Sequence, residues 1–241
     1  RNQMLEAVQS LGNHHRFHPV RDYLDSLEWD GTPRIDTWLI DYGGAENTDF
    51  NRAVGAIFLL AAVRRIREPG CKFDEILVLE SEQGRNKSQA IETLAVQQEW
   101  FTDQSPLGRR DKEVIELIAG RWIVEIAELK GMRNSEIEAT KAFASRRVDS
   151  ARMAYALTTT DAPRQCVFFA TTNDDQYLRD RTGNRRFWPV KVERFDIDAL
   201  RRDRDQLWAE ATERELSRRG DESLIRLPEH LWAAAAEQQE G

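Results

Sequence analysis

A lysine and a serine stand together where a short loop leads into a helical stretch. Lys87 and Ser88 end the segment Glu80–Ser88, which directly follows the apolar run Ile76–Leu79. In a phosphate-binding loop, backbone N–H groups surround the β-phosphate, a lysine reaches the β/γ oxygens and a hydroxyl holds Mg²⁺. The residues of this segment that suit nucleotide binding are Gln83, Gly84, Arg85, Asn86, Lys87 and Ser88. The order of strand, tight loop, Lys-Ser and helix is that of a P-loop.

Two positions of the loop depart from the P-loop pattern. Ser81 and Asn86 stand where the two outer glycines belong. Glycine permits a positive φ and a close approach of the backbone to the ligand, and asparagine tolerates left-handed geometry better than most residues. The alternative interpretation of this segment is an ordinary connection between a strand and a helix.

Acidic residues follow the second apolar run, Trp122–Ile126. An NTPase needs one carboxylate for the Mg²⁺ shell and another to orient or polarise the attacking water. Glu125 and Glu128 are predicted to fill these roles, with Glu125 as a metal ligand beside Ser88, although the pattern leaves open which acid lies on the metal side. The alternative is that both are simply exposed where a strand ends.

Polar and basic residues accompany two further strands. Asn173 follows the apolar run Val167–Thr171 and suits a residue that holds the lytic water or senses the γ-phosphate. Arg185 and Arg186 precede the run Phe187–Val192, where arginines can stabilise charge in the transition state, usually across a subunit boundary. The alternative role of these arginines is salt bridging to Asp174, Asp175 or Asp180.

The elements that must position these residues follow from the apolar pattern. From Glu75 onward, short apolar runs alternate with longer helical stretches, which is typical of βαβ units and a mainly parallel sheet. The expected strands are Ile76–Leu79, Trp122–Ile126, Val167–Thr171 and Phe187–Val192, with a short one at Trp100–Thr102; the expected helices include Val20–Leu27, Ile35–Tyr42, Phe50–Ile66 and Gln89–Gln98. We therefore predict an α/β protein with a helical lead-in subdomain over 1–70 and a core over 71–241.

The last part of this core turns highly charged beyond Phe195. Leu200, Leu207, Trp208 and Leu216 form one helical stripe there, which predicts a solvated amphipathic helix.

Composition limits the function classes. The chain has 241 residues, of which 40% are hydrophobic and 32% charged, with a net charge of −7. Its longest strongly apolar run, Ala53–Val63, is too short to span a bilayer, which takes about 20 residues. Two distant cysteines give neither a disulfide framework nor a cysteine-rich zinc site. We expect a soluble cytoplasmic protein without membrane contact, and Arg1 suggests that a segment precedes it.

Several strings in the sequence are specific enough to identify a family. The segments that contain these strings are Phe17–Leu24, Trp29–Gly31, Pro69–Asp74, Trp122–Leu129, Pro163–Phe168, Thr171–Asn173 and Thr182–Val190. In these segments the chain resembles the virulence-associated protein E family, over roughly Phe17–Trp208. Proteins of that family are similar to the helicase half of phage- and plasmid-type primase-helicases.

The resemblance implies an AAA+-like P-loop ATPase related to superfamily 3 helicases. It implies ATP and Mg²⁺ as cofactors, a homo-oligomeric hexameric ring, single-stranded DNA in a central pore and an upstream primase-type domain. It assigns Lys87 and Ser88 to phosphate and Mg²⁺, Glu125 and Glu128 to the acidic motif, Asn173 to the sensor, and Arg185 and Arg186 to the arginine finger.

The stretch Lys141–Arg164 matches by position the superfamily 3 hairpin that carries basic and aromatic residues into the pore. Its residues predicted to contact DNA are Lys141, Arg146, Arg147, Arg152 and Tyr155. Basic side chains with an aromatic ring suit sequence-independent contact with the DNA backbone and stacking on bases. The alternative is a solvated loop whose arginines pair with Glu136, Glu138 and Asp149.

The sequence thus predicts an ATP-dependent DNA helicase or translocase domain of a replication protein from a mobile element. One alternative is a nucleotide-defective regulatory or DNA-binding module that keeps the fold, because Ser81 and Asn86 add side chains to the phosphate loop. Another is an NTPase of phage defence that never unwinds DNA.

Overall fold

The structure is a computed structural model that describes residues 18–126, 134–152, 159–173 and 184–235. Its helices are α2 (Pro19–Asp25), α3 (Trp38–Asp41), α4 (Asp49–Arg67), α5 (Lys87–Leu94), α6 (Asp111–Ile118), α7 (Asn134–Ala144) and α8 (Ile197–Ser217), with short 3-10 turns η1 (Gln98–Trp100), η2 (Asn184–Arg186), η3 (Glu222–Ile225) and η4 (Glu229–Leu231). Its strands are β1 (Ile76–Glu80), β2 (Phe101–Thr102), β3 (Ile123–Ile126), β4 (Val148–Ala151), β5 (Thr160–Pro163), β6 (Val167–Thr172) and β7 (Phe187–Lys191).

Five of the strands form one parallel sheet in the order β2-β3-β6-β1-β7. All five predicted strands are confirmed, and so is the α/β class. Strands β1, β3 and β6 are buried along their whole length, because helices cover both faces of the sheet. The carboxyl ends of all five strands therefore lie along one edge, where the residues that follow them are brought together.

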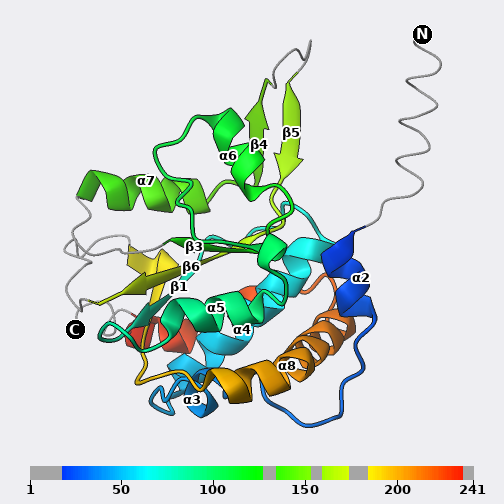
Figure 1. Ribbon diagram of the computed structural model, residues 1–241, viewed down its shortest axis with the longest axis vertical. Helices are drawn as coiled ribbons and strands as arrows, with labels where there is room; N and C mark the ends of the chain where they lie inside the picture. The colour runs from blue at the N-terminus through cyan, green and yellow to red at the C-terminus, as the bar shows by residue number, and fades with distance from the viewer. Residues whose placement is uncertain (1–17, 127–133, 153–158, 174–183, 236–241) are drawn as a thin grey trace.

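Side chains of the central strands alternate between two separate hydrophobic layers. The helices that cover these layers lie on the two sides of the sheet (Figure 1). Leu77 and Leu79 of β1 pack in the larger layer, which α4, α5 and α8 cover, and the ring of Phe58 in α4 lies 4.0 Å from that of Phe169. Ile76 and Val78 face the smaller layer under α6 and α7. This alternation is why the apolar runs of the sequence are continuous.

The helices of residues 19–67 share the larger layer with α8 and the sheet. Trp122 Nε1 donates to the carbonyl of Ala62 in α4 at 3.0 Å, and Trp208 Nε1 of α8 donates to the carbonyl of Leu94 at 2.9 Å. The region predicted as a helical lead-in and the charged C-terminal region thus meet in a common core beside α5. Among the described residues, no helix is long and apolar enough to cross a lipid bilayer.

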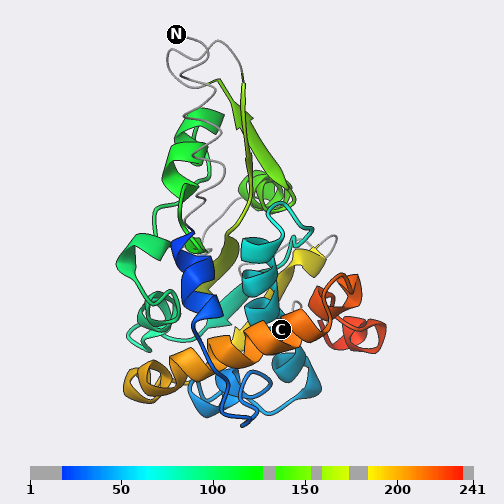
Figure 2. The same cartoon turned by 90° about the vertical axis from the view of Figure 1, so that its right-hand side faces the viewer.

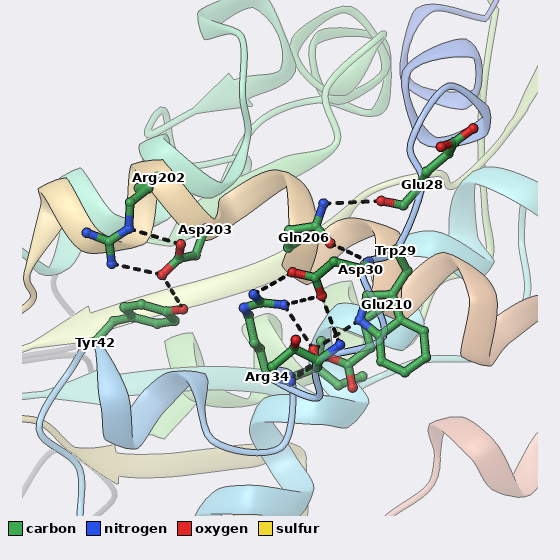
Figure 3. Close-up of polar contacts among 11 residues, drawn as sticks. Glu28, Trp29, Asp30, Arg34, Tyr42, Arg202, Asp203, Gln206 and Glu210 are labelled. Atoms are coloured by element: carbon green, nitrogen blue, oxygen red, sulfur yellow. Dashed lines mark hydrogen bonds and ion pairs between the residues drawn. The ribbon is translucent and has the colours of Figure 1, made fainter.

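An extended segment between α2 and α3 lies along α8 (Figure 3). Buried Glu210 accepts the backbone N–H groups of Arg34 and Ile35 at 2.6 and 3.0 Å, and Gln206 contacts the backbone of Asp30 and Glu28. These bonds fix the N-terminal part of the chain against α8.

Tyr42 continues this attachment where α8 begins. Its hydroxyl donates to Asp203 in α8, and its carbonyl accepts the N–H of Asp196, the N-cap of α8. The beginning of α8 is therefore held against the N-terminal helical region.

The charged C-terminal stretch forms a helix, as predicted, but its buried face is wider than the predicted stripe. Leu200, Leu207 and Trp208 are buried, and the carboxylates of Glu210 and Glu215 are buried with them. Leu216, the last residue of the stripe, is instead 47% exposed. The helix is amphipathic, as predicted, with an exposed charged face; the prediction missed that Glu210 of α8 also accepts hydrogen bonds inside the larger layer.

Helix α5 ends earlier than the predicted Gln98. Val96 adopts a left-handed φ of 70°, and the N–H of Gln97 donates back to the carbonyl of Ala95 at 2.8 Å. A β-branched residue with positive φ is strained, and nothing in the amino-acid types announces it.

Candidate nucleotide-binding site

The P-loop, here Ser81–Asn86, connects the carboxyl end of β1 to α5. Gly84 has φ +80°, a conformation that favours glycine. Asn86 has φ 63° and ψ 23°, so it adopts the left-handed conformation that the missing glycine would supply. Its side chain makes no cap bond to the first turn of α5. The N–H groups of that turn have no partners within the helix, and such groups favour an anion.

Lys87, the first residue of α5, folds back over this loop. Its Nζ donates to Ser81 O at 2.7 Å, Ser81 Oγ at 2.9 Å, Glu82 O at 3.1 Å and Asn173 Oδ1 at 3.0 Å. Burial lowers the pKa of Lys87 from its ordinary value, Arg85 lowers it further, and the charge of Glu125 opposes both. The contact with Asn173 brings together two residues predicted to act on the same phosphate.

Ser88 and Glu125 meet where α5 passes the end of β3. Ser88 Oγ donates to Glu125 Oε1 at 2.8 Å, and Thr171 Oγ1 donates to the same oxygen at 2.9 Å. Burial raises the pKa of Glu125, although these two hydrogen bonds act in the opposite direction. The second predicted acid, Glu128, lies outside the described residues.

A cavity of about 790 Å³ opens beside these groups. Its lining includes the side chains of Ser88 and Glu125 together with three other carboxylates, Glu92, Glu99 and Asp103. A second cavity of about 500 Å³ is lined by Asn86 and by residues around the beginning of α8.

These residues fit a magnesium nucleotide. The loop offers a lysine and the open end of a helix to phosphate, and a hydroxyl and a carboxylate oxygen are the hard donors that Mg²⁺ takes. The hydrogen bond between Ser88 and Glu125 places these two donors within reach of one cation.

The predicted arginine pair lies at the opposite edge of the sheet. Arg185 and Arg186 precede β7, whose first residue, Phe187, pairs with Ile76 at the start of β1. Arg186 Nε lies 3.7 Å from Asp74 Oδ2. Because β1 and β7 are parallel, the length of a five-residue strand, about 15 Å, separates these arginines from the P-loop of the same chain.

The arginines therefore do not lie beside the other motif residues of the same chain. They come before their strand, whereas Lys87, Glu125 and Asn173 follow theirs or lie at its end. The aspartates weighed as alternative partners, residues 174, 175 and 180, lie outside the described residues.

The stretch predicted to contact DNA contains a hairpin of β4 and β5, which projects from the body of the molecule (Figure 2). Arg146 is half-exposed and pairs with Asp111 at 2.9 Å, while Arg147 is exposed and its Nε donates to Gly70 O. Arg152, at the outer end of β4, is exposed. Tyr155 lies outside the described residues.

Two cations of this stretch are turned inward. The ammonium of Lys141 is buried and pairs with Glu138 at 2.7 Å. Arg164 forms a fully buried double hydrogen bond with Asp149 at 2.6 and 2.9 Å, and its guanidinium carbon lies 4.1 Å from the ring centroid of Phe143. Arg164 pairs with Asp149, as the alternative interpretation has it, and lies at the base of the hairpin. Lys141 instead pairs with Glu138 of its own helix, α7. Both charges are buried, so neither lies on a free surface.

Sequence reasoning missed two residues of the site. Thr171 shares Glu125 with Ser88, and the carbonyl of Phe195 accepts the side-chain amide of Asn86 at 3.3 Å. Thr171 could have been found from its place at the end of a buried strand next to Asn173. Phe195 follows β7 by four residues and carries no polar side chain, so nothing in the sequence indicated its role.

Comparison with solved structures places this fold among known ones. Three structures of the C-terminal region of NrS-1, in the apo state, match with TM-scores of 0.59, 0.56 and 0.51 at 12 to 13% identity. Each match covers 90% of this chain and 54% of the NrS-1 chain, so the chain spans about half the length of those neighbours. At this identity the likeness concerns the fold alone. Among curated proteins none matches the chain.

The comparison with family models identifies a family, whereas the comparison with solved structures identifies a fold. The model described as virulence-associated protein E-like domain matches residues 24–241, which is most of the chain and includes every described residue of the candidate site. The protein belongs to the virulence-associated protein E-like family.

Proposed function

We propose that this chain is an ATP-dependent DNA helicase or translocase domain of a replication protein from a mobile element. The observation that carries the proposal is the convergence of Lys87, Ser88, Glu125 and Asn173 on one P-loop at the carboxyl edge of the sheet. The proposal also accords with the family that the chain belongs to, which sequence analysis relates to primase-helicases.

Each residue has a role that its contacts suit. Lys87 would exchange its loop acceptors for phosphate oxygens, and Ser88 and Glu125 would hold Mg²⁺. Asn173, 3.0 Å from the lysine ammonium, would orient the attacking water. Bound Mg²⁺ supplies charge stabilisation to the phosphates. Arg185, at the far edge of the sheet, would serve the site of a neighbouring subunit in a ring.

Single-stranded DNA is the proposed substrate of movement. The projecting hairpin offers the exposed cations Arg147 and Arg152, together with half-exposed Arg146, to the phosphate backbone. Lys141 and Arg164 are left out of this surface because their charges are buried and paired.

The test is ATP hydrolysis by the purified chain with Mg²⁺, with and without single-stranded DNA. We expect turnover that DNA stimulates and that Lys87→Ala abolishes, whereas Lys72→Ala, which removes a half-exposed lysine paired with Asp74, leaves it unchanged. Equal turnover in Lys87→Ala and the wild type would show that the loop is not the site. Turnover without DNA stimulation would instead favour an NTPase that does not move on DNA.

A further inference from the structure

The P-loop carries two side chains where its pattern has glycine, and the structure gives them different contacts. Ser81 begins the loop and Asn86 ends it. Ser81 is not among the described residues with positive φ, so its backbone does not require glycine. The effect of each side chain on a bound phosphate therefore depends on what that side chain contacts.

Ser81 contacts the residue that must receive the phosphate. The Ser81 hydroxyl donates to Glu82 O at 3.2 Å. Because its proton is used in that bond, the oxygen of the hydroxyl is left to accept from the ammonium of Lys87 at 2.9 Å. An ammonium group has three N–H donors. Four oxygens within 3.1 Å already compete for them, two from Ser81, one from Glu82 and one from Asn173. A phosphate must displace these acceptors, so the Ser81 hydroxyl opposes binding.

Asn86 contacts the frame behind the loop instead. Its Nδ2 donates to Phe195 O at 3.3 Å, and the N–H of Phe195 donates to Arg85 O at 3.1 Å. The end of the loop and Phe195 are thus joined in both directions. The side-chain bond is one that glycine at this position could not make.

Phe195 is itself fixed by the N-terminal helical region. Its ring lies 6.3 Å from that of Trp38, and a Cβ on Gly43 would come within 2.9 Å of its Cζ. The next residue, Asp196, donates its N–H to Tyr42 O at 2.8 Å. A loop attached to this frame loses less freedom when a ligand binds, which favours affinity.

We propose that the two residues that replace glycine act in opposite directions on nucleotide affinity. Ser81 weakens binding by competing for Lys87, and Asn86 is a positioning residue that strengthens binding by holding the loop to Phe195. This inference rests on the proposed function, because it concerns the affinity of the same loop for a nucleotide.

The test compares Ser81→Ala, Asn86→Gly and the double variant by calorimetric titration with a non-hydrolysable ATP analogue and Mg²⁺. Alanine removes the hydroxyl and keeps the backbone restricted, while glycine keeps the left-handed φ and removes the amide. One hydrogen bond corresponds to roughly a threefold to tenfold change in affinity. We expect Ser81→Ala to tighten binding by about that factor, Asn86→Gly to weaken it by about that factor, and the double variant to bind close to the wild type.

Amide hydrogen exchange without nucleotide supplies a second readout. In Asn86→Gly the N–H of Phe195 should exchange faster while the buried amides of α4 keep their protection, and Ser81→Ala should leave Phe195 unchanged. Weaker binding with general loss of protection in α4 would mean that the variant is misfolded and would overturn the positioning role.

The two proposals fail in different ways. If the wild type binds the analogue and Asn86→Gly binds it as tightly or more tightly, this inference is overturned and the proposed function stands. If neither the wild type nor any variant binds, both are overturned. Binding by Ser81→Ala alone would support the competition directly.

Discussion

Ser88 Oγ donates a hydrogen bond of 2.8 Å to Glu125 Oε1, although the two residues are 37 positions apart in the chain. Because the hydroxyl of a P-loop is a magnesium ligand, this contact favours Glu125 as the acid on the metal side of the proposed site. The site depends on a carboxylate that is 1% exposed and whose pKa burial raises.

Glu125→Gln should retain nucleotide binding, slow turnover and stabilise the fold at neutral pH. The glutamine oxygen still accepts from Ser88 and Thr171, and the cost of a desolvated charge disappears. Above its raised pKa the wild-type carboxylate is ionised in both the folded and unfolded states and carries this cost. As the pH falls through that pKa the folded state takes up the proton first, so the wild type gains stability until the ordinary value of 4.5 is passed.

Thermal unfolding at several pH values measures this difference. The melting temperature of Glu125→Gln should exceed that of the wild type at pH 7, and the gap should narrow as the pH approaches 4.5. Glu116→Gln, at a half-exposed carboxylate of α6, is the matched control and should show no such trend. A gap that widens on acidification would contradict the raised pKa.

Arg185 and Lys87 should act in different subunits. Alone, Arg185→Ala should bind nucleotide normally and lose turnover, and Lys87→Ala should lose both. When the two variants are mixed, some interfaces combine the intact loop of one chain with the intact arginine of the other, so hydrolysis should partly return. The measurement is ATPase activity against the mixing ratio. No recovery in mixed rings, shown to be mixed by a tag on one variant, would place the arginine outside the reaction.

Arg152→Ala should weaken binding of single-stranded DNA and reduce its dependence on salt. For single strands, the slope of log K against log salt falls by about 0.7 for each phosphate that the protein no longer neutralises. Fluorescence anisotropy over a salt series gives this slope. Arg202→Ala, on the exposed side of α8, is the control for loss of one positive charge and should change neither quantity.

Arg164→Ala should destabilise the fold rather than act on DNA directly. Removing Arg164 takes both of its hydrogen bonds from buried Asp149, whose other ion contact is Arg146 at 3.7 Å, and costs about 3–5 kcal/mol of unfolding free energy. Urea unfolding should show this loss, whereas Arg146→Ala, at a half-exposed cation of the same hairpin, should cost less than about 1 kcal/mol. Similar losses in both variants would contradict the assigned burial.

The sheet could be predicted from sequence because its strands are continuous apolar runs between turn residues. Ile76–Leu79 and Val167–Thr171 are each within one residue of the observed strands. The end of α5 could not be predicted, since the positive φ of Val96 is a conformation that β-branched side chains disfavour. The prediction underestimated the buried face of α8. Glu210 and Glu215 are acidic, which predicts exposure, and their partners in the core lie more than one hundred residues away in the chain.

The site was predictable where its residues are close in the chain. Lys87 and Ser88 follow from the loop itself, and Asn173 from its place after a buried strand. Arg185 lies at the opposite edge of the sheet because it precedes β7, whereas the other site residues follow their strands or lie at the strand ends. The order of residues in the sequence already contains that information. The inward turn of Arg164 depends on Asp149 and Phe143, contacts between elements that spacing does not reveal.

The larger hydrophobic layer contains both the helices of residues 19–67 and α8. This layer therefore cannot be completed until α8 has been synthesised. Helix α4 presents Phe58 and its other buried residues to β6 and α8, which leave the ribosome more than one hundred residues later. Until α8 is made, the part of the apolar face of α4 that packs on α8 stays uncovered, and such exposed apolar surface is prone to aggregation. The protein should therefore gain resistance to protease only when the chain has been extended beyond Ser217.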